Sequence, residues 1–206
     1  MKGKKSIIIG VSGGKGSFSE EAALYYSQKY DLKNSKIKYL ISVERVLKNL
    51  GKDKVDLGIF PIENSNGGIV YEAIYAMAKY NFKIKHLFEI DIRHNLLVKP
   101  NIKKQDIKKI ASHSQALKQC RMYLKRKWPK IELIEWSDTA EAAKDLSQGK
   151  LTPDTAIVAP LNCAKLYNLK ILEREIQDLK FNFTTFLAVK GFVKNYKASR
   201  GNFCYK

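Results

Sequence analysis

Polar side chains that can hold an anionic ligand stand directly after a buried apolar run. The run Val55 to Phe60 leads into Pro61-Ile62-Glu63-Asn64-Ser65, and the glycines of Asn66-Gly67-Gly68 then allow a tight turn. In open α/β sheets, ligands bind beyond the carboxyl ends of the strands. Amide and hydroxyl donors orient a carboxylate without trapping it in a strong ion pair. The sequence therefore predicts a binding site, lined by Glu63, Asn64 and Ser65.

Three further segments place small polar residues between an apolar run and the start of a helix. They are Gly13 to Glu20, Ser112 to Cys120 and Asp138 to Ala143. Backbone N–H groups at the start of a helix favour anions. Helical spacing also puts Gln115 and Gln119 on one face. The residues that these segments offer to a ligand are Lys15, Ser17, Ser112, Gln119 and Thr139.

The glycine-rich loop at Gly10 to Gly16 fits neither common nucleotide motif. A P-loop needs Ser or Thr after its Gly-Lys pair, but here Gly16 follows Lys15, and Ile9 stands where the earlier glycine belongs. The spacing of the glycines also fails the dinucleotide fingerprint. Two interpretations stay open: an anion cradle at a helix start, with Ser17 and Lys15 beside it, or a tight turn with a capping serine.

Several of these side chains also have a plainer interpretation. Ser114 can be a helix cap, Gln119 can lie on a solvated helix face, and Glu63 can brace its own loop. His94 and His113 are candidate acid–base groups, but a lone histidine is more often a packed or capping residue.

Composition limits the classes of protein. The net charge of +18 first suggests nucleic acid, yet the lysines are scattered and no run interleaves basic residues with aromatics. We expect no nucleic-acid partner and a field that attracts a small dianion. The three cysteines are odd in number and have no CxxC spacing, so we expect neither a disulfide framework nor a metal site. Ile7 to Ile9 is too short for a signal or membrane segment, which predicts a cytoplasmic protein without a membrane partner.

Short apolar runs alternate with helical periodicity. We expect strands at Ser6 to Val11, Ile37 to Leu40 and Val55 to Phe60, and helices at Phe18 to Tyr30, Val43 to Leu50 and Ile69 to Lys79. This alternation is typical of a parallel sheet. A β-rich stretch from Phe82 to Lys99 is interrupted near Asp91 to His94. A second series of strands and helices then runs through Ile110, Ser114 to Lys127, Ile131 to Glu135, Thr139 to Gln148 and Thr155 to Ala159. The predicted fold is α/β, with two Rossmann-like lobes and a ligand cleft between them.

Five motifs recur in an order that resembles the catalytic domain of prephenate dehydratase. They are Gly13 to Glu20, Pro61 to Ser65, Ser112 to Cys120, Asp138 to Ala143 and Asn182-Phe183-Thr184-Thr185-Phe186, and the resemblance runs from about Ile7 to Val189. It implies an architecture similar to type II periplasmic binding proteins. Lobe one would comprise residues 1–92 plus 176–206, and lobe two residues 93–175. It also implies a homodimer.

The resemblance implies a hydro-lyase that converts prephenate, a small dianion, to phenylpyruvate in phenylalanine biosynthesis. No metal or organic cofactor is expected. Asn64, Ser112, Gln119 and Thr184 match positions that the family uses for substrate binding and turnover, with Thr184 as the catalytic residue. Only 17 residues follow Val189, so we expect no regulatory ACT domain.

One position departs from the family pattern. Thr185 stands where the family has arginine, so a bidentate carboxylate donor is lost, and Lys15, Arg93 or Arg174 are candidates to replace it. Asp138 also stands where a small hydroxyl residue is common, which is tolerable if its carboxylate caps the helix and faces away.

Three alternative functions remain. A divergent relative would decarboxylate prephenate without expelling the hydroxyl. An arogenate dehydratase would take the amine-bearing substrate. A noncatalytic protein that binds a small anion is the alternative from another class.

Overall fold

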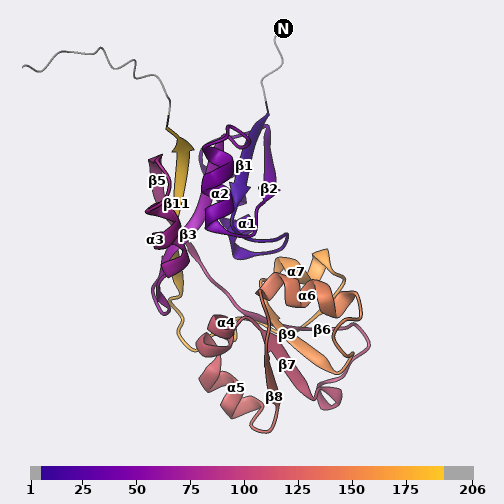
Figure 1. Cartoon of the computed structure of the whole chain (residues 1–206). Coiled ribbons are helices and arrows are strands. Elements are labelled where there is room, and N and C mark those ends of the chain that lie inside the picture. Colours follow the sequence, from indigo (N-terminus) through magenta and orange to yellow (C-terminus); the bar gives the residue numbers. More distant parts are fainter. Residues whose placement is uncertain (1–5, 193–206) are drawn as a thin grey trace, which may run out of the picture.

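The computed structural model describes residues 6–192, and these form two α/β lobes joined by two crossing segments (Figure 1). Each lobe is built around its own sheet. The two-lobed α/β architecture that the sequence predicted is confirmed.

The sheet of lobe one has the order β2-β1-β3-β11-β5, and β4 pairs with β3. β1 is parallel to β2 and β3, whereas β11 is antiparallel to both β3 and β5. Its elements are β1 (Ile7–Val11), α1 (Phe18–Lys29), β2 (Ser35–Tyr39), α2 (Val43–Leu50), β3 (Leu57–Asn64), β4 (Gly68–Ile69), α3 (Tyr71–Met77), β5 (Phe82–Asp91) and β11 (Phe183–Gly191).

Apolar side chains cover both faces of this sheet. One cluster joins α1 to the sheet through residues such as Ala22, Ile59 and Phe186, and a second joins α2 and α3 through Val46, Phe60 and others. Burial on both faces explains the near-continuous apolar runs of the central strands.

The sheet of lobe two has the order β10-β6-β9-β7-β8. All its strands come from residues 95–173, and β11 then returns the chain to the first sheet. Its elements are β6 (Asn95–Val98), the 3₁₀ helix η1 (Lys104–Asp106), β7 (Lys109–Ser112), α4 (Ser114–Gln119), α5 (Arg121–Lys127), β8 (Glu132–Glu135), α6 (Thr139–Ser147), β9 (Thr155–Ala159), α7 (Asn162–Leu166) and β10 (Lys170–Glu173). The lobe boundaries near residues 92 and 176 stay a prediction, and residues 1–5 and 193–206 of the predicted lobe one lie outside the described residues.

The structure differs from the expected elements at two places near the crossing. β3 continues through the expected loop to Asn64, because this segment pairs with β11. The register of that pairing shifts next to Pro61, which has no N–H to donate to the neighbouring strand. The expected single helix after Ser114 is broken at Cys120. There the Asp178 carboxylate accepts hydrogen bonds from the backbone N–H groups of Met122 and Tyr123, at 2.8 Å each, and so caps α5.

The two lobes also touch where α7 meets the glycine loop of lobe one. The Tyr167 hydroxyl donates to the Lys15 carbonyl oxygen at 2.8 Å, and the Cys163 thiol donates to the Gly16 carbonyl oxygen at 3.3 Å. Gly16 has a φ of +89°, a conformation that favours glycine. Within residues 6–192, no helix is long and apolar enough to cross a membrane.

Candidate active site

The side-chain amide of Asn64 lies at the centre of a polar cluster where the lobes meet. Its Nδ2 donates to Thr184 Oγ1 at 2.8 Å and to Asn182 Oδ1 at 3.0 Å. Its Oδ1 accepts from Gln119 Nε2 of lobe two at 2.9 Å. Asn64 and Thr184 are paired across β3 and β11, so their side chains lie on the same face of the sheet.

One further side chain, His94, completes this amide cluster, which we define as Asn64, Gln119, Asn182, His94 and Thr184. Gln119 Oε1 accepts from Asn182 Nδ2 at 2.9 Å and lies 2.7 Å from His94 Nε2. Three of the five are buried, with exposed fractions of 0% for Asn182, 3% for His94 and 7% for Thr184. Burial lowers the pKa of His94, so its neutral form is favoured.

Backbone groups fix which way the Asn64 amide points. The Asn66 N–H donates to Asn64 Oδ1 at 2.9 Å, and the Phe183 carbonyl oxygen accepts from Nδ2 at 3.1 Å. A backbone N–H only donates and a carbonyl oxygen only accepts. Thr184 Oγ1 therefore accepts a hydrogen bond from Asn64, and the threonine's own hydroxyl hydrogen donates to none of the described residues.

Ser65 braces the start of β11. Its hydroxyl accepts from the Phe183 N–H at 3.0 Å, and its own N–H donates to the Phe183 carbonyl oxygen at 2.8 Å. This double contact holds Phe183 beside the loop and so places the next residue, Thr184. Glu63, by contrast, is exposed and makes no hydrogen bond through its carboxylate with the described residues.

The remaining predicted site residues lie outside the amide cluster. Ser112 is fully buried and donates to the Val158 carbonyl oxygen at 2.6 Å. Ser17 caps α1, and Thr139 is buried at the start of α6, which Asp138 caps as expected. Lys15 is exposed in the loop that contacts α7.

The glycine loop already holds a carboxylate of the chain itself. The Gly16 N–H donates to Glu20 at 2.6 Å, and the Tyr39 hydroxyl donates to the same buried carboxylate. The Ser17 N–H donates to the Gly14 carbonyl oxygen at 3.2 Å. These two loop N–H groups are therefore engaged within the loop and helix.

Thr185 lies on the opposite face of β11 from Thr184, because side chains alternate along a strand. Its hydroxyl donates to Glu89 of β5 at 3.2 Å. An arginine at this position would point away from the amide cluster, so its loss removes no contact with Thr184. Of the suggested replacement cations, Arg93 is held by Asp91 at 2.8 Å and by Glu175 at 2.6 Å.

Two cavities flank the crossing, and the first touches the amide cluster. It has a volume of about 450 Å³, within the range of small-molecule sites, and is lined by Asn66, Gly67, Gln115, Lys118, Gln119, Met122, Asp178 and Leu179. Gln115 and Gln119 share the cavity-facing side of α4, as their spacing predicted. Lys118 provides a cation there.

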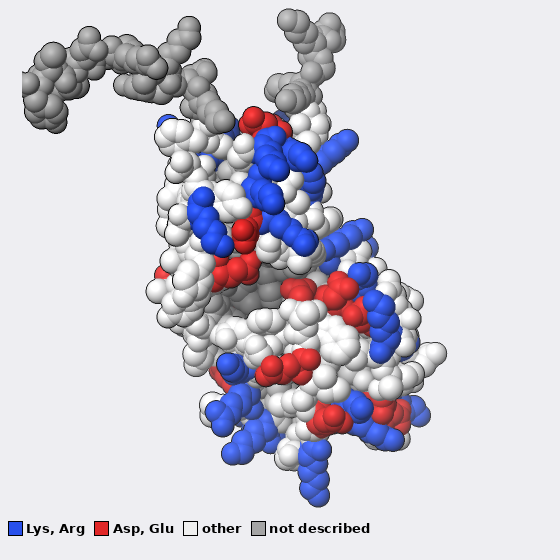
Figure 2. Space-filling view, in the orientation of Figure 1, with Lys and Arg blue, Asp and Glu red and all other residues white. Residues whose placement is uncertain are grey.

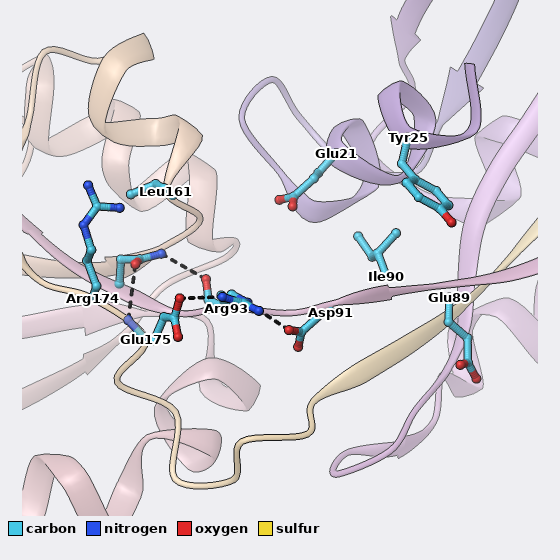
Figure 3. A pocket seen from close by; sticks show the side chains of 10 residues that line it. Glu21, Tyr25, Glu89, Ile90, Asp91, Arg93, Leu161, Arg174 and Glu175 are labelled. Atoms are coloured by element: carbon cyan, nitrogen blue, oxygen red, sulfur yellow. Dashed lines mark hydrogen bonds and ion pairs between the residues drawn. The ribbon is translucent and has the colours of Figure 1, made fainter. Parts of the chain in front are cut away.

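The second cavity, of about 390 Å³, is mostly charged (Figure 3). It is lined by Glu21, Tyr25, Glu89, Ile90, Asp91, Arg93, Asn95, Leu161, Arg174 and Glu175. Figure 3 shows Arg93 between Asp91 and Glu175, with Glu21 of α1 facing this group across the cavity. Burial and the neighbouring Asp91 raise the pKa of Glu21. Figure 2 shows the surface hollowed between the lobes, with acidic side chains at the rim.

Sequence reasoning missed two residues at the cluster, Asn182 and Lys118. Asn182 belongs to a motif that was used only for Thr184, whereas His94 was named as a candidate acid–base group but with a packed or capping role as the commoner alternative. Lys118 lies between two glutamines on one helical face, and this spacing was the available signal. Within the described part of the chain, no group of three or more His, Cys, Asp or Glu could hold a metal ion.

Two α/β lobes around a polar crossing define a fold similar to the type II periplasmic-binding-protein architecture. A putative methionine-binding lipoprotein from Bacillus subtilis superimposes with a TM-score of 0.51 at 15% identity, covering 97% of this chain and 87% of that one, and it shows the fold alone. The chain belongs to the prephenate dehydratase family, because the model of that family matches residues 9–191.

Individual relatives support the same family assignment. The prephenate dehydratase of Methanocaldococcus jannaschii is 34% identical over 192 residues, covering 90% of this chain and 67% of the relative. The bifunctional chorismate mutase/prephenate dehydratase of Pseudomonas aeruginosa is 30% identical, covering 90% of this chain and 49% of the relative. The structure of prephenate dehydratase from Arthrobacter aurescens in complex with L-Phe has a TM-score of 0.80 at 26% identity, covering 90% of this chain and 60% of that one. The chain thus spans about half the length of the bifunctional relatives.

Proposed function

We propose that the chain catalyses the decarboxylating dehydration of prephenate. The observation that carries the proposal is the direct contact of Asn64, Gln119 and Thr184, three residues that match the family's functional positions. In the reaction, the bond from the ring to its carboxylate breaks and its electron pair enters the ring. The ring C–O bond breaks, and the departing oxygen takes one proton and leaves as water. Prephenate and one proton thus give phenylpyruvate, CO2 and water.

Thr184 acts as the hydrogen-bond donor to the departing oxygen. Its oxygen accepts from Asn64 at 2.8 Å, so its hydroxyl hydrogen points elsewhere. A threonine hydroxyl is a weak acid, so it keeps its proton and stabilises the developing charge by a directed hydrogen bond, and the departing oxygen takes its proton from the solvent. An uncharged cluster also leaves the scissile carboxylate poorly solvated, which favours its loss as CO2.

The substrate enters beside α4, where the 450 Å³ cavity meets Gln119. Lys118 and Gln115 are available there for a carboxylate. Asn64 and Gln119 bind each other directly across the lobes and Thr184 is buried, so access requires the lobes to separate about the crossing segments. The predicted contacts of Ser65, Ser112, Ser17, Thr139, Glu63 and Lys15 with substrate remain proposals, and the bonds of Ser112, Ser65 and Ser17 described above suit a supporting role.

The test is to incubate the purified chain with prephenate and to follow phenylpyruvate by its absorbance in alkali. We expect the wild type to form phenylpyruvate and Thr184→Val to lower kcat by about 10²- to 10⁴-fold. The matched control is Thr185→Val, one residue away on the other face, which should stay within about twofold. Prephenate that persists unchanged with the wild type would favour a binding protein.

Arogenate is a second candidate substrate and can be tested in the same assay. The arogenate dehydratase 2 of Petunia hybrida is 37% identical to this chain over 133 residues. The second cavity has an excess of negative charge, because its lining has four carboxylates and only two arginines, Arg93 and Arg174, and this excess favours an ammonium group over a keto group. Phenylalanine formed from arogenate faster than phenylpyruvate from prephenate would establish that alternative. Loss of CO2 without an aromatic product would establish the decarboxylase.

We also propose a cytoplasmic homodimer. β5 is an edge strand with Leu87 60% exposed, and α3 exposes Tyr71 and Tyr75 by 67% and 68%. Exposed apolar surface of this kind suits contact with a second copy. The buried free thiols of Cys120 and Cys163 suit a reducing compartment. Sedimentation velocity that shows a monomer at all concentrations, or fractionation outside the cytoplasm, would contradict these two statements.

A further inference from the structure

The orientation fixed at Asn64 propagates to Gln119. Because Asn64 Oδ1 already accepts from a backbone N–H, it can only be an acceptor for Gln119. The Gln119 atom that faces it at 2.9 Å is therefore Nε2. The opposite end of the Gln119 amide, Oε1, must then accept hydrogen bonds from its other two neighbours.

Asn182 provides an independent check of this direction. Its Nδ2 donates to the Ile92 carbonyl oxygen at 3.2 Å, and a carbonyl oxygen only accepts. The same Nδ2 faces Gln119 Oε1 at 2.9 Å, which is the acceptor deduced from the Asn64 side. Two separate backbone anchors thus assign the same polarity to the cluster.

His94 is the remaining neighbour of Gln119 Oε1. Since that oxygen is an acceptor, His94 Nε2 must carry a hydrogen and donate across the 2.7 Å contact. Its Nδ1 is buried and has no hydrogen-bond partner among residues 6–192. A second hydrogen on Nδ1 would be buried without an acceptor, which is strongly unfavourable. Phe18 packs against the His94 ring in a T-shaped arrangement, with 5.4 Å between the ring centroids, and its side chain has no nitrogen or oxygen acceptor.

We propose that His94 is a positioning residue for turnover and acts as a neutral imidazole with its hydrogen on Nε2. Its N–H holds Gln119, Gln119 holds Asn64, and Asn64 occupies the Thr184 oxygen, so the threonine hydrogen stays available for the departing oxygen. This inference rests on the proposed function for its catalytic meaning. The tautomer itself follows from the hydrogen bonds alone.

The first experiment measures that tautomer without turnover. The chain has three histidines, His86, His94 and His113, so ¹⁵N imidazole NMR of the wild type and of His94→Gln assigns the His94 signals. We expect a neutral ring protonated at Nε2 at neutral pH. A ring protonated at Nδ1, or a charged ring, would overturn the inference even if the enzyme is active. The expected spectrum with no activity on any substrate would overturn the proposed function and leave the tautomer standing.

The second experiment separates positioning from packing. Glutamine at position 94 can still donate to Gln119 Oε1, whereas leucine cannot. We expect His94→Leu to lower kcat by about tenfold or more with KM nearly unchanged, and His94→Gln to recover most of the rate. The matched control is His86→Leu, which removes a histidine that bonds Tyr26 at 2.7 Å within lobe one. Equal losses for leucine and glutamine in folded protein, or a loss confined to KM, would contradict the positioning role.

If His94→Leu does not fold, as judged by circular dichroism, the glutamine variant carries the test. It should then fold and retain kcat within about threefold, because the donated hydrogen bond is kept. A large loss of kcat in folded His94→Gln would overturn the inference.

Discussion

Two polar clusters lie at the crossing of the lobes, and they are held together by opposite means. The amide cluster around Asn64 is uncharged and three of its five side chains are buried, and each of its contacts has a fixed donor and acceptor. The ionic cluster joins Arg93 to Asp91 and Glu175 at 2.8 and 2.6 Å, and its arginine side chain is 56% exposed.

The difference shows what each cluster can provide. An exposed ion pair is screened by water and salt and tolerates many geometries, so it links the lobes without directing a particular hydrogen. A chain of amides has a direction, and this direction makes the Thr184 oxygen the acceptor from Asn64 and leaves the threonine's hydroxyl hydrogen for another partner. A reaction that needs one directed hydrogen is therefore better served by the neutral cluster.

The largest expected effect comes from introducing a charge into the neutral cluster. In Asn64→Asp, the carboxylate cannot donate to Thr184, Asn182 or the Phe183 carbonyl oxygen, and it would instead accept the threonine's hydroxyl hydrogen. We expect kcat to fall by about hundredfold or more and the protein to lose at least about 2 kcal/mol of unfolding free energy. Turnover assays and chemical denaturation measure the two effects.

The reciprocal variant is the control for this prediction. Asp91→Asn removes a charge from the ionic cluster at nearly constant shape, and one Asp91 oxygen is already buried without a partner in the described part of the chain. We expect the free energy of unfolding to fall by less than about 1 kcal/mol and kcat to stay within a few-fold of the wild-type value. Similar losses in both variants would mean that the two clusters do not differ as described.

A smaller effect is expected from removing the arginine. Arg93→Gln should destabilise the protein only slightly at low salt, because the Arg93 side chain is 56% exposed and water screens its two ion pairs. Since salt screens exposed charges, the difference from the wild type should shrink as ionic strength rises towards 1 M. Denaturation curves at two salt concentrations measure this. A loss that is the same at both would contradict the ionic description.

The smallest effect concerns Glu21 and pH. Burial, and then Asp91, raises its pKa above the ordinary 4.5, so the folded state binds this proton more tightly than the unfolded state does. Stability therefore falls as pH rises from about 4.5 through the raised pKa. At pH 7, Glu21→Gln should raise the free energy of unfolding by less than about 1 kcal/mol, which is seen as a slightly higher melting temperature. Near pH 4 this gain in stability should vanish. A gain that persists at pH 4 would refute this assignment.

Much of the fold was predictable because apolar periodicity is local. The helix Val43–Leu50 and the strand Thr155–Ala159 have the expected bounds. The extension of β3 to Asn64 was not predictable in the same way, because it depends on pairing with β11, about 120 positions later in the sequence. The break at Cys120 likewise depends on Asp178, a distant residue that caps the new helix.

The candidate site likewise combines residues that local motifs predicted with contacts that depend on distant parts of the chain. The motifs led to Asn64, Gln119 and Thr184, which the structure brings together. Composition and spacing could not reveal that the Ser112 hydroxyl is satisfied by a neighbouring strand, since that partner lies 46 residues away. Nor could they show that Thr185 faces away from Thr184, because that requires the paired strand in which side chains alternate.

Gly16 sets how closely the two halves of the molecule can approach. A methyl group at this position would lie 3.0 Å from Cys163 Sγ and 3.2 Å from Leu166, and the φ of +89° would strain any larger residue as well. The minimum separation between the glycine loop and α7 is thus set by a hydrogen atom where other amino acids carry a carbon. Gly16 therefore determines how closely the glycine loop and α7 can pack, although it has no side chain that could take part in chemistry.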